Sequence, residues 1–539
     1  MSLGGGLSSA MLGALRTPNG GSKTPRGYSA NSPANGSSSN IKSATEVKVL
    51  LKEMQKNFEF AFKGTRTLFS LSRRREPRGW IEKEGGIKVL INVMQSHMSD
   101  ADVQEFGCGC LRNLASGSET RKRRIVKDGG IAVSLTAMRS FPTDVGVQAT
   151  GCGVLGNLAA GSEERKNQIE MAGGTDAVVS CMRAHLEDPV VQLAGCTAIR
   201  NFTSGSKVRA ERIVVLGGIE LVLRAMEQHQ GDVEVQAEGC RALCNLAFAS
   251  EEATSKIEEQ GGVKAVLRAA DIHKDDPEVQ ATSCCLLGNF ACGNHGRAKR
   301  IVAEGAIEKV LDAMGEHEDD PDVQAEACCT LRNLAMGNEQ TAIVIDKEEG
   351  LESIVDAMEA HVLHKGVSAA GCAALSTLAW RSEDRAERIV ELKGIDAIMI
   401  ALSNHVEDPN VQEHGCNALW NLSLANKEVK DRVQEEGGLF AALGAMKGNP
   451  SSAEVQSAAL GALLVFVVDS SDKQEDIVEE GGIQTILSAI HAHAENKSVC
   501  QLGANVLKCM AKWDSSIASS IKQQSKAMGI DLGRLQSGA

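Results

Sequence analysis

The chain has 539 residues, a formal net charge of -13 and an aromatic content of 3%. Such an acidic chain is a poor general binder of nucleic acid. Its length would suit several globular domains, or one repeat array in which each unit packs only on its neighbours. Because apolar residues reach 42% with so few aromatics, we expect a core of aliphatic and small side chains.

The sequence predicts neither secretion nor a membrane anchor. The first residues, MSLGGGLSSAMLGAL, lack a charged region, and no apolar run reaches the roughly 20 residues of a membrane span. We therefore expect a protein of the cytoplasm or nucleus. Its 16 cysteines would then be reduced thiols.

Two segments precede the regular part of the chain. Residues 1–45 are rich in Gly, Ser, Asn and Pro, a composition typical of a disordered tail. Residues 46–71 have a helical pattern that is out of frame by one residue with the regular part. We interpret this second segment as an N-terminal helical cap.

Residues 72–511 repeat with a period of 44 residues, and the dipeptide Val-Gln marks the repeat. Its valines are Val103, Val147, Val191, Val235, Val279, Val323, Val411 and Val455, while Val367 and Val499 keep the valine without the glutamine. The spacing holds through all ten positions without insertion or deletion. The chain therefore contains ten units of one architecture.

One unit, residues 116–159, can be interpreted as three helices. Residues 119–127 form a charged helix that stops at a glycine pair, and residues 131–138 are apolar at helical spacing. Asp144 is placed to cap a long third helix that runs to Ala159. Nothing alternates with period two, so no strand is predicted.

The cap position recurs along the whole array. Its residues are Asp100, Asp144, Asp188, Asp232, Asp276, Asp320, Asp408, Ser452 and Asn496. Four of the aspartates precede a proline, which suits the first residue of a helix. Residues 512–539 contain one more first-helix signal, Ile521, and are interpreted as a C-terminal cap and tail.

A unit that reads G-G-I, V-Q, G-C and L-x-N-L-A resembles the armadillo repeat over residues 72–511. The resemblance implies an all-α, right-handed superhelix of about ten three-helix repeats with helical caps. It also implies a concave groove lined by the third helices. In members similar to importin-α, asparagines of this groove bond the main chain of an extended peptide.

The matching asparagine column is the first candidate binding site. It contains Asn113, Asn157, Asn201, Asn245, Asn289, Asn333 and Asn421. An amide offers a donor and an acceptor to a main chain. The alternative is that each asparagine bonds the backbone of a neighbouring repeat.

The importin-like tryptophan column, four residues before the asparagines, is absent. Gly109, Gly153 and Thr197 stand at its first positions, and no tryptophan occupies the others. Without tryptophans to sandwich lysine side chains, the sequence argues against a nuclear-import cargo adaptor.

Arginine and tryptophan make up the remaining candidates. Arg112, Arg200 and Arg332 precede groove asparagines, and Arg241 lies nearby; they suit partners with carboxylates or phosphates, or are ordinary surface arginines. Trp380 and Trp420 fall at predicted groove positions in adjacent units. They are either binding hot spots or core residues.

Two further columns are interpreted as structural. Cysteines from Cys108 to Cys416 follow small residues and suit close helix packing. Histidines from His97 to His493 end the second helix, where we expect them to bond its last carbonyls. Members of each column are a whole repeat apart, so they cannot share a metal. No cofactor is predicted.

The sequence thus predicts a non-catalytic scaffold or adaptor that holds an extended segment of a partner protein. The alternative is a regulator that binds a folded partner, such as a small GTPase or a motor domain. Neither nucleic acid nor a small-molecule substrate is expected to bind. No catalytic motif supports an enzyme: the dinucleotide-like spacing of Gly151, Gly153 and Gly156 lies inside a predicted helix rather than after a strand.

Overall fold

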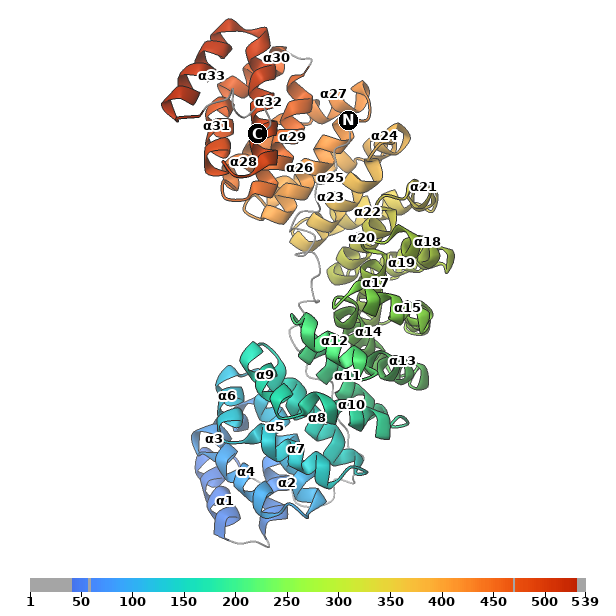
Figure 1. The fold of residues 1–539 in the computed structure, drawn as a ribbon, viewed down its shortest axis with the longest axis vertical. Helices are drawn as coiled ribbons and strands as arrows, with labels where there is room; N and C mark the ends of the chain where they lie inside the picture. Colours follow the sequence, from blue (N-terminus) through green and yellow to red (C-terminus); the bar gives the residue numbers. More distant parts are fainter. Residues whose placement is uncertain (1–40, 57–59, 469–470, 531–539) are drawn as a thin grey trace. The chain divides into compact units, whose positions relative to one another are not determined.

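The computed structural model describes residues 41–56, 60–468 and 471–530. That part of the chain forms 33 helices and no strand, so the predicted all-α solenoid is confirmed (Figure 1). Of the expected disordered tail, residues 1–45, residues 1–40 lie outside the described residues; residues 41–45 are described, and α1 (Ala44–Lys56) begins within them.

The described residues divide into two units. The N-terminal unit comprises residues 41–286 and the C-terminal unit residues 287–530. The boundary falls inside one long helix, α17 (Pro277–Ala291). Each unit is built from the same three-helix repeat.

The first helix of each repeat is short and charged. These helices are α3 (Arg75–Lys83), α6 (Glu119–Lys127), α9 (Glu163–Met171), α12 (Lys207–Val215), α15 (Glu251–Glu259), α18 (His295–Ala303), α21 (Glu339–Lys347), α24 (Glu383–Glu391), α27 (Lys427–Glu435) and α30 (Ser471–Glu479).

The second helix is mostly apolar. These helices are α4 (Gly86–Ser96), α7 (Gly130–Ser140), α10 (Gly174–Ala184), α13 (Gly218–Gln228), α16 (Gly262–Ile272), α19 (Ala306–Glu316), α22 (Gly350–Ala360), α25 (Gly394–Asn404), α28 (Gly438–Gly448) and α31 (Gly482–Ala492).

The third helix is the longest of each repeat. Besides α17, these helices are α5 (Ala101–Ala115), α8 (Val145–Ala159), α11 (Pro189–Thr203), α14 (Val233–Ala247), α20 (Pro321–Ala335), α23 (Lys365–Ala379), α26 (Pro409–Ser423), α29 (Ala453–Val467) and α32 (Lys497–Trp513).

The predicted helix bounds of the unit 116–159 are confirmed to within two residues. The first and third helices end where expected, and the second runs from Gly130 to Ser140. The predicted cap is also confirmed, because the Asp144 carboxylate accepts from the Val147 amide at 2.9 Å. At the one position without an Asp, Ser or Asn, His364 Nδ1 accepts from Val367 N at 3.3 Å.

The glycine pair turns the chain between the first and second helices. Gly129 has φ +100°, a left-handed conformation that suits glycine. A Cβ at the next residue, Gly130, would come within 2.8 Å of the Ile125 carbonyl oxygen. The first glycine thus permits the turn, and the second lets the two helices approach closely.

The Val-Gln motif joins the third helix to the second. The valine of each pair is fully buried, as at Val103. Gln104 Nε2 donates to the carbonyl oxygens of Met94 and His97, both at 2.9 Å. It therefore satisfies two carbonyls at the end of the second helix. All eight glutamines of the motif bond in this way.

Third helices pack side by side within each unit. In the N-terminal unit α2 (Ala61–Ser72), α5, α8, α11 and α14 form one layer, and in the C-terminal unit α20, α23, α26, α29 and α32 form another. Because α2 packs on α5 as a third helix would, α1 and α2 cover the first repeat. At the other end α33 (Ser515–Ala527) packs on α31 and α32.

No helix in the described ranges is long and apolar enough to cross a membrane.

Buried arginines tie successive first helices together. Arg165, on α9, donates through Nη1 and Nη2 to the two Glu119 carboxylate oxygens, on α6, at 2.8 and 2.9 Å. Its Nε also donates to the Leu158 carbonyl at 2.6 Å, at the end of the third helix between them. One side chain thus joins two repeats and satisfies a helix terminus.

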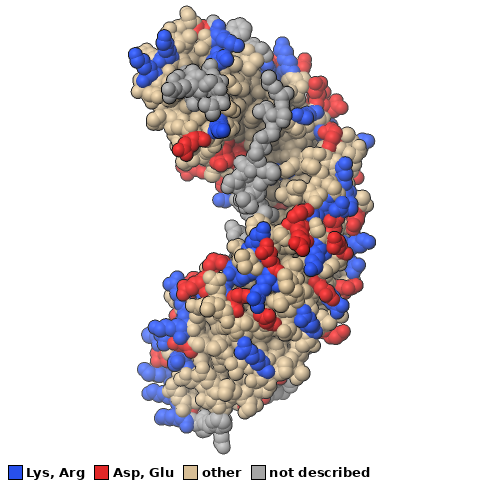
Figure 2. Space-filling view, in the orientation of Figure 1, with Lys and Arg blue, Asp and Glu red and all other residues tan. Residues whose placement is uncertain are grey.

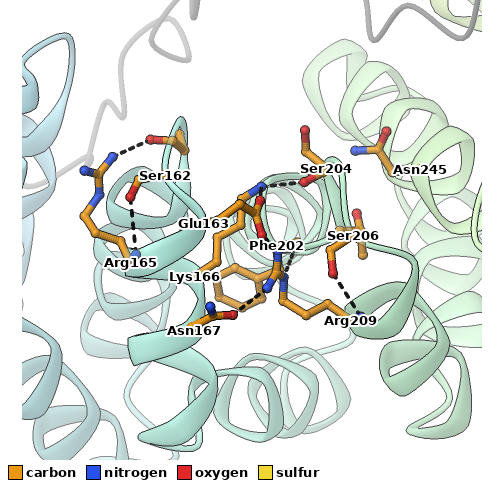
Figure 3. A network of polar contacts seen from close by, with 12 residues as sticks. Ser162, Glu163, Arg165, Lys166, Asn167, Phe202, Ser204, Ser206, Arg209 and Asn245 are labelled. Atoms are coloured by element: carbon orange, nitrogen blue, oxygen red, sulfur yellow. Dashed lines mark hydrogen bonds and ion pairs between the residues drawn. The ribbon is translucent and has the colours of Figure 1, made fainter. Parts of the chain in front are cut away.

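The same device recurs in both units. Figure 3 shows Arg209 reaching Glu163 and Asn167, which lie on the preceding first helix. Farther along, Arg385 forms a two-bond pair with Glu339 at 2.8 and 3.0 Å. These contacts were not predicted from the sequence, although arginines 44 residues apart were a visible signal.

Candidate partner-binding surface

The exposed side of the third-helix layers, called here the third-helix face, carries the predicted asparagine column. Asn245 Nδ2 donates to the carbonyl oxygen of Arg200, in the preceding repeat, at 2.8 Å. Asn157, Asn201, Asn333 and Asn421 make the same bond at 3.0 to 3.1 Å. Each asparagine therefore helps to hold two repeats together, as the alternative interpretation proposed.

The two remaining asparagines lie on the same face. Asn113 Nδ2 donates to Ser72 Oγ at 3.0 Å, on the cap helix α2. Asn289 is on α17 and, like the others, is partly exposed. An amide that donates once to the adjacent repeat still has an acceptor oxygen and a second N–H, so the predicted contact with a partner stays a prediction.

Two of the predicted arginines are joined to acidic side chains. Glu238 lies between them, with one carboxylate oxygen 3.2 Å from Arg200 Nε and the other 3.2 Å from Arg241 Nη1. The same Arg241 nitrogen is 2.7 Å from Glu278. Burial alone would lower the pKa of Arg241, but Glu238 and Glu278 outweigh it and hold the pKa above its ordinary value. These ion pairs offset much of the positive charge on which the sequence-based prediction rested.

The other two arginines occupy different surroundings. Arg112 packs across Gly153 of the next third helix and places Nη2 3.5 Å from Asn113 Oδ1. In the C-terminal unit, Arg332 acts electrostatically on His414. Burial, and then Arg332, lower the pKa of His414 to about 4, so this histidine is neutral near pH 7.

The two predicted tryptophans have different roles. Trp420 lies on α26 against Gly461 of α29, where a Cβ would overlap the indole ring. Trp380 directly follows α23 and is 46% exposed. It is therefore not a core residue, and the Arg381 guanidinium lies 5.3 Å from its ring centroid.

The cysteine column is buried inside the repeats. Burial raises the pKa of Cys108 and of Cys416 to about 12. These thiols are protonated near neutral pH and are poor nucleophiles and metal ligands. The structural interpretation of this column is therefore supported.

The histidine column bonds differently from what we expected. His97 Nδ1 does lie 2.8 Å from a carbonyl of its own helix, that of Val93. Six others instead place Nε2 at 2.7 to 3.2 Å from a carbonyl 43 residues earlier, in the preceding repeat: His185, His229, His273, His361, His405 and His493. For these six the expected bond within one helix was wrong. The stacking of repeats brings a loop carbonyl of the previous repeat within reach of the ring.

Charge is distributed unevenly over the surface. Figure 2 shows Lys and Arg gathered along the edge of the N-terminal unit formed by α3 and α6, which includes the exposed residues Arg74, Arg75, Arg123 and Arg124. On the C-terminal unit, acidic and basic side chains are mixed along the edge formed by α21 and α24. The net charge of -13 therefore does not describe any single surface.

Comparison with known proteins identifies both a family and structural relatives. The sequence model of the family described as GAC ARM domain matches residues 154–515. No curated protein matches the sequence. An engineered protein solved by the Northeast Structural Genomics Consortium shares 27% identity, with 78% of this chain and 98% of that chain aligned and a TM-score of 0.62.

A second solved structure shows the same fold at lower identity. It is described as "A conserved phosphorylation switch controls the interaction between cadherin and beta-catenin in vitro and in vivo". The identity is 16%, the alignment covers 88% of this chain and 96% of that chain, and the TM-score is 0.60. At this identity the likeness concerns the fold alone.

Proposed function

Because the chain belongs to the GAC ARM domain family of armadillo repeat proteins, we propose that it is a non-catalytic scaffold. In this proposal the third-helix face holds an extended segment of a partner protein. The observation that carries it is the line of partly exposed asparagines on successive third helices, each fixed by a bond to the preceding repeat. A side chain fixed in this way loses little conformational entropy when a partner binds.

The fixed amides determine the chemistry of the partner. With one N–H used, the amides of Asn157, Asn201, Asn245 and Asn333 retain an acceptor oxygen and one donor hydrogen. A main chain in extended conformation presents the complementary groups at regular intervals. The solved structure with the same fold concerns the interaction of cadherin with beta-catenin, which is a precedent for a protein partner.

The charges refine this proposal. Partner carboxylates or phosphates would be directed to the predicted arginines of the third-helix face. Arg200 and Arg241 already contact Glu238 and would have to exchange that contact. The proposed setting is the cytoplasm or the nucleus, and neither a cofactor nor a small-molecule substrate is required.

The test compares proteins that co-purify with the intact chain from its own cells and with a variant. The variant carries Asn201→Ala, Asn245→Ala, Asn289→Ala and Asn333→Ala. A control carries Asn92→Ala and Asn410→Ala, which are exposed asparagines outside the column. Thermal unfolding of all three proteins reports the stability lost with the inter-repeat bonds.

We expect the variant to lose a partner that both the intact protein and the control retain, at a temperature where all three are folded. Retention of every partner by the variant would contradict the proposal. If binding of a partner is instead lost when a compact cluster of residues elsewhere is substituted, this result would favour the alternative, a regulator that binds a folded protein.

A further inference from the structure

The residue that directly follows each third helix changes in character along the chain. In the N-terminal unit these residues are Ser116, Ala160, Ser204 and Phe248. In the C-terminal unit, from α17 to α29, they are apolar or sulfur-containing: Cys292, Met336, Trp380, Leu424 and Val468; Asp514 follows α32. The last three are 46%, 52% and 44% exposed, and we call them the apolar row.

Members of the apolar row lie in line, one repeat apart. Asn421 donates to the carbonyl of Ser376, 45 residues earlier, at 3.0 Å, and Trp420 packs on Gly461, 41 residues later. His405 Nε2 and Asn449 Nδ2 also each bond a carbonyl oxygen 43 residues earlier, so the repeats that contain α23, α26 and α29 stack in the same register. Packed helices lie about 8–10 Å apart, so the three residues span roughly 20 Å.

The backbone beside Trp380 is strained. Arg381 has φ +58°, whereas five other repeats place a glycine there, with φ from +66° to +81°. A left-handed conformation at a residue other than glycine is unfavourable, and such residues cluster at binding sites. Here the strained residue is exposed and sets its guanidinium against the Trp380 ring, a pairing that favours recognition.

The charge around the apolar row is positive on the third helices. In the C-terminal halves of α20, α23, α26, α29 and α32, the charged residues are Arg332, Lys508 and Lys512. The first helices that follow the row carry both signs of charge: Glu383, Asp384 and Glu387 of α24 and Lys427 and Glu428 of α27 are exposed, and Asn426 Nδ2 donates to Glu387 Oε1 at 2.7 Å. The cations at the two ends of the row, Arg381 and Lys508, therefore complement acidic side chains at the two ends of a partner segment whose apolar side chains cover the row.

The spacing of the row selects the conformation of that partner. Seven residues of an α-helix rise about 10.5 Å and return to the same face, which is close to one repeat. Side chains on one face of a β-strand recur at about 6.6–6.8 Å, which does not match. A helix can therefore set apolar residues seven apart onto successive members of the row.

We propose that the apolar row of the C-terminal unit, with Arg381, binds an acidic amphipathic helix of a partner protein. Apolar side chains at i, i+7 and i+14 of that helix lie on Trp380, Leu424 and Val468. Acidic side chains beside them face Arg381 at one end and Lys508 at the other. This proposal stands whether or not the asparagine column binds an extended segment.

The test measures binding of designed fluorescent helical peptides to the full chain by anisotropy. The first peptide has leucines at i, i+7 and i+14 with glutamates on the flanks. The second replaces each glutamate with lysine, and the third has the composition of the first without its seven-residue period. We expect binding of the first alone at protein concentrations up to about 100 µM.

Variants of the chain test which of its residues bind the peptide. We expect Trp380→Ala to weaken binding at least about tenfold. Arg381→Gly should also weaken it while leaving the thermal midpoint unchanged or higher, because glycine suits φ +58°. The matched control is Phe248→Ala, at the same position of a repeat in the N-terminal unit and 43% exposed; it should bind as the intact protein does.

Three outcomes would overturn the proposal. One is no binding of the acidic peptide, and another is equal binding of the lysine or aperiodic peptide. The third is a concentration-dependent dimer in sedimentation that Trp380→Ala abolishes, because a second copy of this chain would then cover the row. The fourfold asparagine variant should still bind the peptide, so failure of either proposal can be recognised separately.

Discussion

Arg165 and Glu119 are 46 residues apart in the sequence and form a two-bond ion pair with N–O distances of 2.8 and 2.9 Å. The arginine is 5% exposed, and it also donates to the Leu158 and Ala160 carbonyls. Replacing Arg165 leaves the Glu119 carboxylate and the Leu158 and Ala160 carbonyls without these hydrogen-bond donors. We expect Arg165→Met to lower the free energy of unfolding by about 2–4 kcal/mol.

Urea unfolding followed by circular dichroism measures this loss. The matched control, Arg123→Met on α6, changes an exposed arginine and should stay within about 0.5 kcal/mol of the intact protein. Equal effects of the two changes would show that the buried pair adds nothing to stability.

The Arg165 pair also predicts a dependence on pH. The hydrogen bond from Arg165 holds the pKa of Glu119 below its ordinary value of 4.5. A carboxylate with a lowered pKa stabilises the fold above its unfolded pKa and loses this effect as pH falls through the folded pKa. The difference in stability between the intact protein and Arg165→Met should therefore be smaller at about pH 3 than at pH 7. A constant difference across that range would contradict the assigned pair.

The two hydrogen bonds donated by Gln236 predict that replacing the glutamine of a Val-Gln motif lowers the stability of the fold. Its Nε2 donates to the Met226 and His229 carbonyls at 2.8 and 3.0 Å, and the side chain is buried. Gln236→Met keeps a similar volume but leaves two carbonyls without this donor. We expect a loss of about 2–3 kcal/mol in thermal unfolding, against almost none for Gln228→Met, an exposed glutamine of α13.

The contact between Trp420 and Gly461 predicts that adding one methyl group at Gly461 destabilises the fold. Alanine is ordinarily about 1 kcal/mol better than glycine inside a helix, but a Cβ here overlaps the indole ring. We expect Gly461→Ala to destabilise the chain by about 1–3 kcal/mol and to change the tryptophan fluorescence. In Gly153→Ala the overlapped atom belongs to the flexible Arg112 side chain, so that variant should be close to neutral. A stabilising Gly461→Ala would show that the ring moves without cost.

His414 predicts acid sensitivity of the C-terminal unit. Its pKa is lowered from 6.5 to about 4, by burial first and by Arg332 second. Because the unfolded histidine takes up a proton at higher pH than the folded one, stability falls as pH drops below the unfolded pKa. Between roughly pH 7 and pH 5 this amounts to about 2 kcal/mol.

The variant His414→Asn should lose less stability over that pH range than the intact protein does. Unfolding by urea at several pH values provides the measurement. The control is Asn410→Ala, which changes an exposed side chain that does not titrate and should leave the slope between pH 7 and pH 5 unchanged. Parallel curves for the intact protein and His414→Asn would mean that this ring titrates as an exposed one.

The sequence by itself determined the repeat frame, the three-helix unit and the caps of the third helices. These features are local: Asp144 accepts from the amide of Val147, three residues later, and Gly129 turns the chain at its own position. Residue type and spacing over a few positions are enough to predict them.

Only the tertiary structure decided which side chains meet between repeats. Asn245 bonds the backbone of Arg200, Arg165 pairs with Glu119, and Trp380 lies exposed directly before the strained residue Arg381. These relations depend on the register in which whole helices pack, and that register is set by the summed contacts of many buried side chains. A pattern along one chain gives the period of such contacts but not the partner of each atom.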